Sequence, residues 1–155
     1  EDVSGYANSK LILSNRGNFD NYPAFKASKE YPAPAPATTT GWFLPSSGQW
    51  WDILQNLGSS HDLAQSDQQN SSATEDPDAA GFVWNGNVAA ALNGWLSEVA
   101  AEGKSTFDES MMWFWSSSEY SNGYALAWNV TIYGWLKSGH TSKGFRGYVR
   151  PILAF

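Results

Sequence analysis

The residues of this sequence that are best suited to catalysis are two histidines and three carboxylates. His61 lies in a polar stretch and His140 in a Ser-Gly-His-Thr turn, and the carboxylates are Asp108, Glu109 and Glu119. Two carboxylates suffice in principle to hydrolyse a glycosidic bond, but nothing in the spacing of these three pairs them. The chain also lacks Gly-x-Ser-x-Gly, His-Glu-x-x-His and phosphate-loop motifs. We therefore expect a protein that is not an enzyme.

One acidic cluster, Glu75-Asp76-Pro77-Asp78, offers the oxygen ligands that Ca²⁺ prefers. It has no further ligand at regular spacing and no glycine of the kind that EF-hand loops need, so a solvated loop is the favoured interpretation. The sequence has no cysteine, which excludes disulfides, thiolate metal sites and cysteine nucleophiles. We expect neither a metal nor a cofactor.

Aromatic residues are numerous: nine Trp, seven Tyr and eight Phe accompany many Ser, Asn and Gly. Binding surfaces use this mixture because Tyr and Trp supply large rigid contact areas, while Ser, Gly and Asn supply adaptable hydrogen bonds. A core filled with aromatic side chains would give the same composition. Composition alone leaves both interpretations open.

The candidate ligand-binding residues are aromatic, amide and hydroxyl side chains in the turns and strands of the C-terminal half. They are Tyr120, Asn122, Tyr124, Asn129, Thr131, Tyr133, Trp135 and His140. Tyr and Trp would anchor the contact. The alternative, which we favour for Trp128, is that alternating residues from 124 to 132 form a buried strand face. Tyr133 and Trp135 flank a predicted turn glycine, which favours their exposure.

Two charged residues raise a separate question. Glu119 follows three serines and could orient a ligand, although a carboxylate in a Ser-rich turn more often closes backbone hydrogen bonds. Arg150 precedes Pro151 in an otherwise apolar segment, where a guanidinium needs a buried partner. Our hypothesis is that Glu119 is this partner.

Charge and hydropathy limit the partners. The formal charge of −6 and the pI near 4.7 argue against nucleic acid, because binding to phosphates needs clustered Lys and Arg and the nine basic residues are scattered. No apolar run approaches the ~20 residues of a membrane span. A chain that begins at Glu1 suits a processed export product or an excised domain, with any signal or anchor outside it.

The elements that must position these residues begin with helices. Residues 5–13 are compatible with a short helix, and the Pro-, Ala- and Thr-rich run 31–40 predicts a surface connector, because each Pro removes a donor and restricts the preceding residue. The clearest helix starts at Ser46 or Ser47 and stops at Gly58, since apolar residues recur in it at i, i+3, i+4 and i+7.

The second half changes from helical to strand periodicity. Polar residues 59–78 predict a long exposed loop, and an apolar stripe predicts a helix over 87–101 that ends at Gly103. Beyond Phe107 the apolar residues alternate, which predicts strands, and the chain finishes on an apolar strand over 148–155. Turn signals separate the strands at 121–123, 133–134, 138–139 and 143–144. Helices first and an antiparallel sheet last predict an α+β fold in one domain, 1–155.

Three segments occur together in a familiar order: Gly-Trp-Phe-Leu-Pro-Ser-Ser-Gly-Gln-Trp at 41–50, Phe-Trp-Ser-Ser-Ser-Glu-Tyr at 114–120 and Tyr-Val-Arg-Pro-Ile-Leu-Ala-Phe at 148–155. Together they resemble the bacterial C-type-lectin-like domains of Bacteroidetes surface and fimbrial-type proteins and of related secreted adhesins. The pattern is also similar to the variable proteins of diversity-generating retroelements, in which a C-terminal block is rewritten on a fixed scaffold.

The resemblance implies a C-type-lectin-like fold without disulfides, with two main helices on a small twisted antiparallel sheet. It also implies a ligand surface between Trp115 and Phe145 for an unidentified protein or glycan. It implies display outside the cell or on its surface, as part of a larger surface protein, a lipoprotein, a pilus tip or a phage-like particle.

The sequence departs from calcium-dependent lectins, because it lacks Glu-Pro-Asn and Gln-Pro-Asp tripeptides and Trp128-Asn129-Val130 lacks the expected Asp. Calcium-mediated sugar binding is therefore not expected. Formylglycine-generating enzymes have a related fold but depend on cysteines or bound copper. Two alternatives to a ligand-binding module remain: a carbohydrate-active enzyme or its accessory domain, and a structural pilus or assembly subunit with its aromatic surface against a neighbour.

Overall fold

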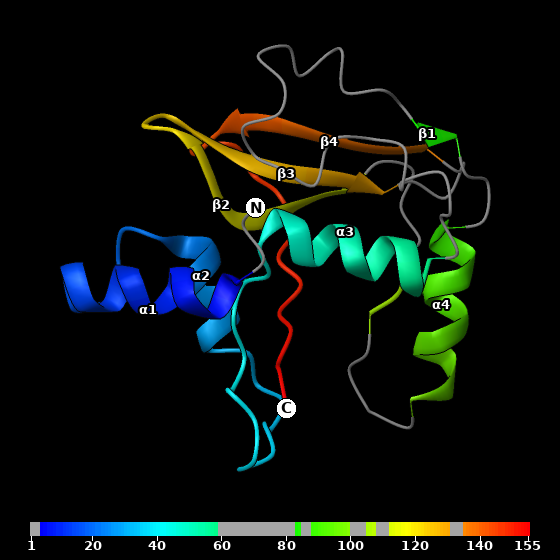
Figure 1. The fold of residues 1–155 in the computed structure, drawn as a ribbon, viewed down its shortest axis with the longest axis horizontal. Coiled ribbons are helices and arrows are strands. Elements are labelled where there is room, and N and C mark those ends of the chain that lie inside the picture. Colours follow the sequence, from blue (N-terminus) through cyan, green and yellow to red (C-terminus); the bar gives the residue numbers. More distant parts are fainter. Residues whose placement is uncertain (1–3, 59–82, 85–87, 100–104, 108–111, 131–134) are drawn as a thin grey trace.

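The order of the elements makes the fold α+β, as the sequence predicts (Figure 1). The computed structural model describes residues 4–58, 83–84, 88–99, 105–107, 112–130 and 135–155. The helices are α1 (Gly5–Arg16), α2 (Pro23–Lys29), α3 (Ser47–Asn56) and α4 (Val88–Glu98). The strands are β1 (Val83–Trp84), β2 (Met112–Ser121), β3 (Tyr124–Val130) and β4 (Trp135–Ser142).

The strands form an antiparallel sheet in the order β1-β4-β3-β2. β3 pairs with β4 without interruption along its whole length. The β2–β3 pairing shifts register between Trp115 and Glu119, because these two residues lie opposite Ala127 and Ala125. Four steps along β2 thus match two steps along β3, and the extra residues form a bulge in β2.

The C-terminal segment differs from its prediction, because 148–155 is not a continuous strand. It forms two isolated bridges: Tyr148 lies parallel to Phe114 of β2, and Ile152 lies antiparallel to Phe43. Pro151 lies between the bridges and has no N–H to donate to a ladder. The segment therefore connects the β2 edge of the sheet to the residues that precede α3.

One face of the sheet packs against α3 and α4 and forms the main core. The strand residues that share this face and are buried are Met112, Phe114, Leu126, Trp128 and Val130. Trp50 and Leu54 of α3 and Leu92 of α4 lie in the same cluster. The interpretation of Trp128 as a core residue is confirmed, since it is 1% exposed. Burial itself does not alternate along β3, because its residues 126–130 are all buried.

Helix α3 begins where the sequence predicts, at a capping box. Ser46 Oγ accepts a hydrogen bond from the Gln49 N–H at 3.2 Å, and Gln49 Oε1 accepts one from the Ser46 N–H at 3.0 Å. The same Gln49 oxygen accepts a bond from the Gly5 N–H at 2.9 Å. The start of α1 is therefore held against the start of α3.

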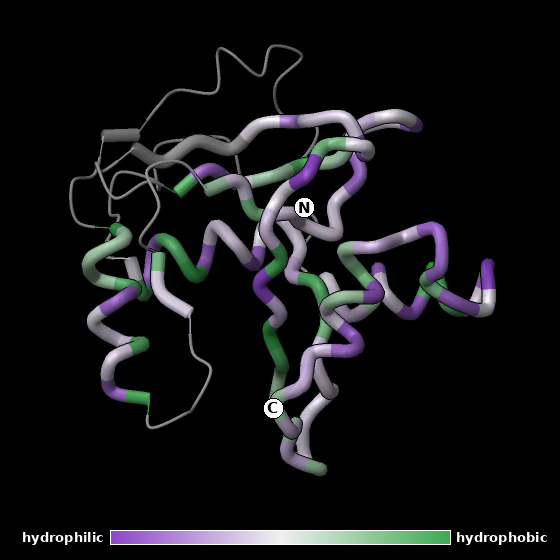
Figure 2. Tube along the Cα trace, turned by 180° about the vertical axis from the view of Figure 1, so that it is seen from behind, coloured by the Kyte–Doolittle hydropathy of each residue, from purple (hydrophilic) through white to green (hydrophobic). Residues whose placement is uncertain are grey.

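The other helices differ from the predictions in extent. α1 continues beyond residue 13 to Arg16 and ends at Gly17, whose φ of 77° is the left-handed cap conformation. α2, which was not predicted, starts at Pro23, a favoured first residue because its missing N–H would have no partner there. α4 lies within the predicted range 87–101, and apolar and polar residues alternate along it in Figure 2.

The Pro-rich connector is confirmed as irregular structure, since residues 31–40 contain no helix or strand. It packs against its neighbours at three points. Trp42 Nε1 donates to the Ala33 carbonyl at 2.6 Å, the Tyr31 and Trp42 rings meet edge to face with centroids 5.0 Å apart, and the Thr40 N–H donates to the Ala154 carbonyl at 3.0 Å. These contacts hold the connector beside the C-terminal segment.

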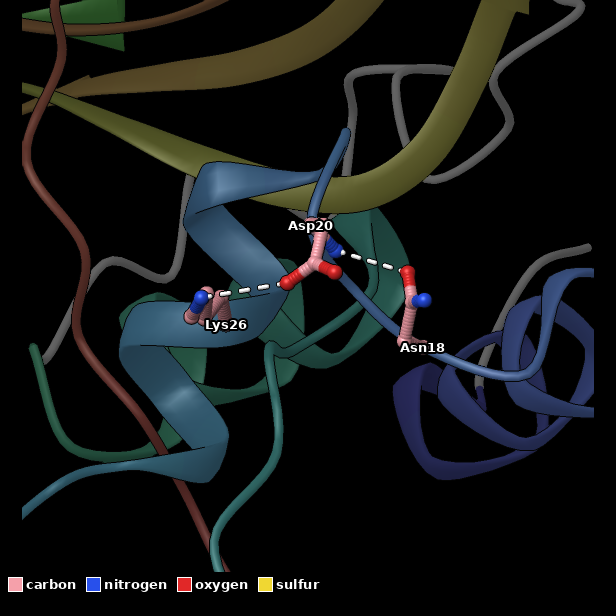
Figure 3. Close-up of polar contacts among 3 residues, drawn as sticks. All are labelled: Asn18, Asp20 and Lys26. Carbon is pink, nitrogen blue, oxygen red and sulfur yellow. Dashed lines mark hydrogen bonds and ion pairs between the residues drawn. The ribbon is translucent and has the colours of Figure 1, made fainter.

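The turn between α1 and α2 is stabilised by two side-chain hydrogen bonds that both involve Asp20 (Figure 3). The Asp20 N–H donates to Asn18 Oδ1 at 3.0 Å, and Lys26 Nζ donates to Asp20 Oδ1 at 3.1 Å. The hydrogen bond to Asp20 and the attraction of the Asp20 and Glu30 carboxylates raise the pKa of the Lys26 ammonium above its ordinary value. Both members of the Lys26–Asp20 pair are largely exposed.

We expect Lys26→Gln to lower the melting temperature only slightly at neutral pH, because solvent screens this exposed pair. Since the folded-state pKa is raised, the pair's contribution is complete below the unfolded-state pKa of Lys. It is lost as the pH rises through the folded-state pKa. Melting temperatures of both proteins at neutral pH and in alkaline buffer test this, and a difference that widens in alkali would contradict it.

The polar loop predicted over 59–78 and the acidic cluster within it lie outside the described residues. No helix in the described ranges is both long and apolar enough to cross a membrane.

Candidate functional site

The β2–β3 hairpin projects beyond the rest of the sheet, and the end of β4 lies beside its turn (Figure 1). The hairpin contributes residues 119–124, and the end of β4 with the following turn contributes residues 140–146. We call these two segments the hairpin tip. The tip contains four of the predicted ligand-binding residues: Tyr120, Asn122, Tyr124 and His140.

Three rings of the tip, one each from β2, β3 and β4, are linked by contacts through His140. The His140 ring stacks on Tyr120, with centroids 4.2 Å apart and an interplanar angle of 12°. It meets Tyr124 edge to face, with centroids 5.3 Å apart and an angle of 87°. Tyr124 is 45% exposed, whereas Tyr120 and His140 are half-buried. We call these residues the aromatic triad; in it the half-exposed Tyr124 ring packs edge to face on His140.

A lysine joins the two turns of the tip. Lys143 Nζ pairs with the Glu119 carboxylate and donates to the Asn122 carbonyl at 3.1 Å. The Lys143 N–H donates to the Gly123 carbonyl at 2.9 Å, and the Phe145 N–H donates to the Ser142 carbonyl at 2.8 Å. The exposed Asn122 side chain is therefore presented on a turn that is fixed by backbone and charged contacts.

The predicted pairing of Arg150 with Glu119 is wrong. Arg150 Nη2 donates to the Ser105 carbonyl at 2.9 Å and to Ser105 Oγ at 3.2 Å, and its guanidinium carbon lies 4.2 Å from the Phe107 ring centroid. Arg150 follows the Tyr148 bridge, which lies beside Phe114, whereas Glu119 lies at the hairpin end of β2. Burial lowers the pKa of the Arg150 guanidinium, and the nearby Tyr31 phenol acts in the opposite direction.

Asn129 also differs from its predicted role, because it lies inside the protein. It is 5% exposed, and its Nδ2 donates to the Met112 carbonyl at 3.3 Å. Trp113 lies opposite Asn129 on β2. Its indole extends across β3 towards Gly139 of β4, where an added Cβ would lie 3.6 Å from the ring. Asn129 therefore supports the sheet and does not contribute to the exposed surface.

The side chains of the three remaining predicted residues, Thr131, Tyr133 and Trp135, are not among those that the structure describes. Thr131 and Tyr133 lie outside the described residues. Trp135 begins β4 and its backbone pairs with Trp84 of β1, but its side chain lies outside the description. Its backbone is at the opposite end of β4 from the tip. The site defined by described side chains is therefore smaller than the predicted one.

The three serines after Trp115 are structural. They occupy the β2 bulge, where Ser116 Oγ donates to the Leu126 carbonyl at 2.8 Å and Ser118 Oγ accepts from the Ser47 N–H at 2.9 Å. The Ser117 N–H donates to the Pro45 carbonyl at 2.8 Å. The serine motif thus joins the sheet to the start of α3.

Sequence reasoning missed two exposed residues of the tip. Phe145 is 45% exposed, and its ring meets Trp115 edge to face at 6.4 Å. Arg146, which follows it, is exposed. Both follow Gly144 and precede Gly147, and this Gly-x-x-Gly spacing was a signal for a surface turn.

The described part of the chain contains no group of three His, Asp or Glu side chains placed to hold a metal ion. The candidate catalytic residues His61, Asp108 and Glu109 lie outside that part. Glu119 is in it, on the exposed surface and paired with Lys143.

No model of a known protein family matches this chain, and no curated protein and no solved structure matches it either.

Proposed function

We propose that this chain is a non-enzymatic recognition module with a C-type-lectin-like fold, which binds a protein or glycan outside the cell through the hairpin tip. The observation that carries the proposal is the aromatic triad, in which the half-exposed Tyr124 ring packs against His140 and His140 in turn stacks on Tyr120. A rigid tyrosine with exposed amide and hydroxyl groups around it is the composition of protein recognition surfaces.

The structural use of the sequence motifs supports this assignment. Trp50 Nε1 donates to the Trp115 carbonyl at 3.1 Å, and Trp128 Nε1 donates to Ser47 Oγ at 3.0 Å. Serines 116–118 bind α3 and the strands, so the motifs shared with lectin-like domains stabilise the scaffold. The tip projects from this scaffold, as loops that carry function commonly do.

The fold and the location are part of the same proposal. Helices followed by an antiparallel sheet, without cysteines, are what the resemblance to Bacteroidetes C-type-lectin-like adhesins implies. The module would then be displayed on the cell surface or at a pilus tip, as one part of a larger protein. The similarity to retroelement variable proteins makes the tip the natural place for sequence variation.

A structural subunit is a second candidate, and one observation favours it. Trp95 of α4 is 60% exposed, and Val99 after the same helix and Leu57 after α3 are also exposed. Exposed apolar side chains of this kind mark interfaces between proteins. The α4 surface lies far from the hairpin tip in Figure 1, so the two functions can be tested separately.

We expect Tyr124→Ala to abolish specific binding of the purified domain on an array of glycans and surface proteins, because it removes the exposed ring of the triad. Loss of a central aromatic anchor typically weakens an interface by about 2 kcal/mol or more, which is roughly thirtyfold in Kd. Trp95→Ala is the matched control, because it removes an exposed aromatic ring away from the tip.

The two variants also separate the two candidate functions. If Tyr124→Ala binds as the parent does while its melting temperature is unchanged, the tip is not the site. If Trp95→Ala converts an oligomer to a monomer in a sedimentation experiment and the array stays blank for the parent, the structural role replaces recognition.

A further inference from the structure

Charge is strongly segregated along this chain. All fifteen acidic residues lie within residues 1–119. Residues 120–155 contain no Asp or Glu and carry four of the nine basic residues: Lys137, Lys143, Arg146 and Arg150. An acidic protein therefore has a purely basic C-terminal part, and such asymmetry commonly marks the region that meets a charged partner.

Two of these four basic residues lie at the hairpin tip. Lys143 is paired with Glu119, the last acidic side chain in the sequence. Arg146 is exposed and forms no hydrogen bond or ion pair with any residue of the described part of the chain. Arg150 differs from it, because it is half-buried and bound to Ser105. The tip therefore presents one free guanidinium.

The surroundings of Arg146 indicate the kind of anion. Phe145, the preceding residue, is half-exposed, and Ser142 and Asn122 place an exposed hydroxyl and amide on the two adjoining turns. A guanidinium presents a planar fork of donors that matches a carboxylate or sulfate. Sugar rings combine apolar C–H faces with hydroxyl groups, which are complementary to aromatic rings and to small polar side chains respectively.

We propose that the hairpin tip binds an acidic glycan, with Arg146 holding a carboxylate or sulfate group and the adjacent, half-exposed Phe145 contacting a sugar ring. This inference rests on the proposed recognition function and names the class of ligand. Residues 1–119 carry fifteen acidic and only five basic side chains, so an anionic ligand is disfavoured along the rest of the chain.

The test is an array of glycan pairs that differ only in their acidic group: sialylated, uronate-containing or sulfated glycans beside their neutral parents. We expect the parent protein to bind acidic members and Arg146→Gln to bind them about tenfold to hundredfold more weakly, as loss of a charge-assisted hydrogen bond predicts. Arg146→Lys should recover part of the affinity, because it restores the charge without the fork. Binding should also weaken with added salt.

Arg16→Gln is the matched control, because Arg16 is an exposed arginine at the end of α1 and is not part of the tip. Equal binding of acidic and neutral glycans, or equal losses in the Arg146 and Arg16 variants, would overturn the inference. Poly-glutamate and duplex DNA test other anionic ligands. Tighter binding of either than of acidic glycans would contradict the proposed ligand class.

The outcomes also distinguish this inference from the proposed function. If the domain binds a protein or a neutral glycan and Tyr124→Ala removes the binding, the recognition function stands and the acidic ligand is wrong. If acidic glycans bind and Tyr124→Ala has no effect while Arg146→Gln does, the charge is confirmed and the aromatic triad is not part of the site. If nothing binds, both proposals fail.

Discussion

Gly5→Ala will destabilise this protein by about 3 kcal/mol or more, because the added methyl group has no space. A Cβ on Gly5 would lie 2.1 Å from the Leu44 carbonyl oxygen and 2.8 Å from the Ser46 nitrogen, and both are backbone atoms that cannot rotate away. The start of α1 would have to move. Such a movement would break the hydrogen bond from the Gly5 N–H to Gln49, whose side chain also caps α3.

The control for this prediction is Gly94→Ala, which should have the opposite sign. Gly94 lies within α4 and has no other heavy atom within 4 Å of its added Cβ. Alanine stabilises such a helical position by about 0.5–1 kcal/mol, since glycine loses more backbone entropy on folding. Urea denaturation of both variants measures the difference. Similar midpoints for Gly5→Ala and the parent would contradict the close packing of α1 on the segment before α3.

The helices that could be predicted are those in which local signals agree. In α3 a capping box, an apolar stripe at helical spacing and a following glycine all point to the same bounds, and the structure has them. α2 has seven residues and no such stripe, so only Pro23 could have indicated its start. Short helices are stabilised by tertiary contacts, which a periodicity does not show.

The strands were predictable from alternation, but their ends and partners were not. Period two correctly assigns the residues of β3 to its two faces, and it identifies Trp128 as core, but both faces are buried over residues 126–130. The same pattern does not say that Asn129 is covered by the residues of neighbouring strands. A sheet with both faces partly covered buries polar residues as well, so alternation alone overstates the exposed set.

The candidate site shows the same division between local and long-range information. Turn residues at 121–123 and 143–144 correctly indicate two exposed turns, but only the fold brings them together through Lys143. The partner of Arg150 depends on which end of β2 meets the C-terminal segment, a long-range register that no local motif encodes. The aromatic triad therefore had members that could be predicted and a geometry that could not.

The second large effect is expected at Trp128. Trp128→Ala should cost about 3–5 kcal/mol, because it removes the largest side chain from the face of the sheet that packs on α3 and leaves a cavity. It also removes two hydrogen bonds at the start of α3, because Trp128 Nε1 donates to Ser47 Oγ at 3.0 Å and to the Ser47 carbonyl at 3.2 Å. The sheet and α3 would lose both packing and a direct hydrogen-bonded link.

Two comparisons make this prediction specific. Trp95→Ala removes the same side chain from an exposed position and should change the free energy of unfolding by less than about 0.5 kcal/mol. Trp128→Phe keeps most of the buried volume but removes the N–H and part of the ring system, so it should cost about 1–2 kcal/mol or somewhat more and remain measurable if the alanine variant does not fold. The free energies of unfolding come from denaturation curves of the three variants. Similar values for Trp128→Ala and Trp95→Ala would show that the Trp128 indole is not part of the core. An intermediate value for Trp128→Phe would show that a smaller buried ring, which cannot donate the hydrogen bonds to Ser47, keeps part of the contribution of Trp128.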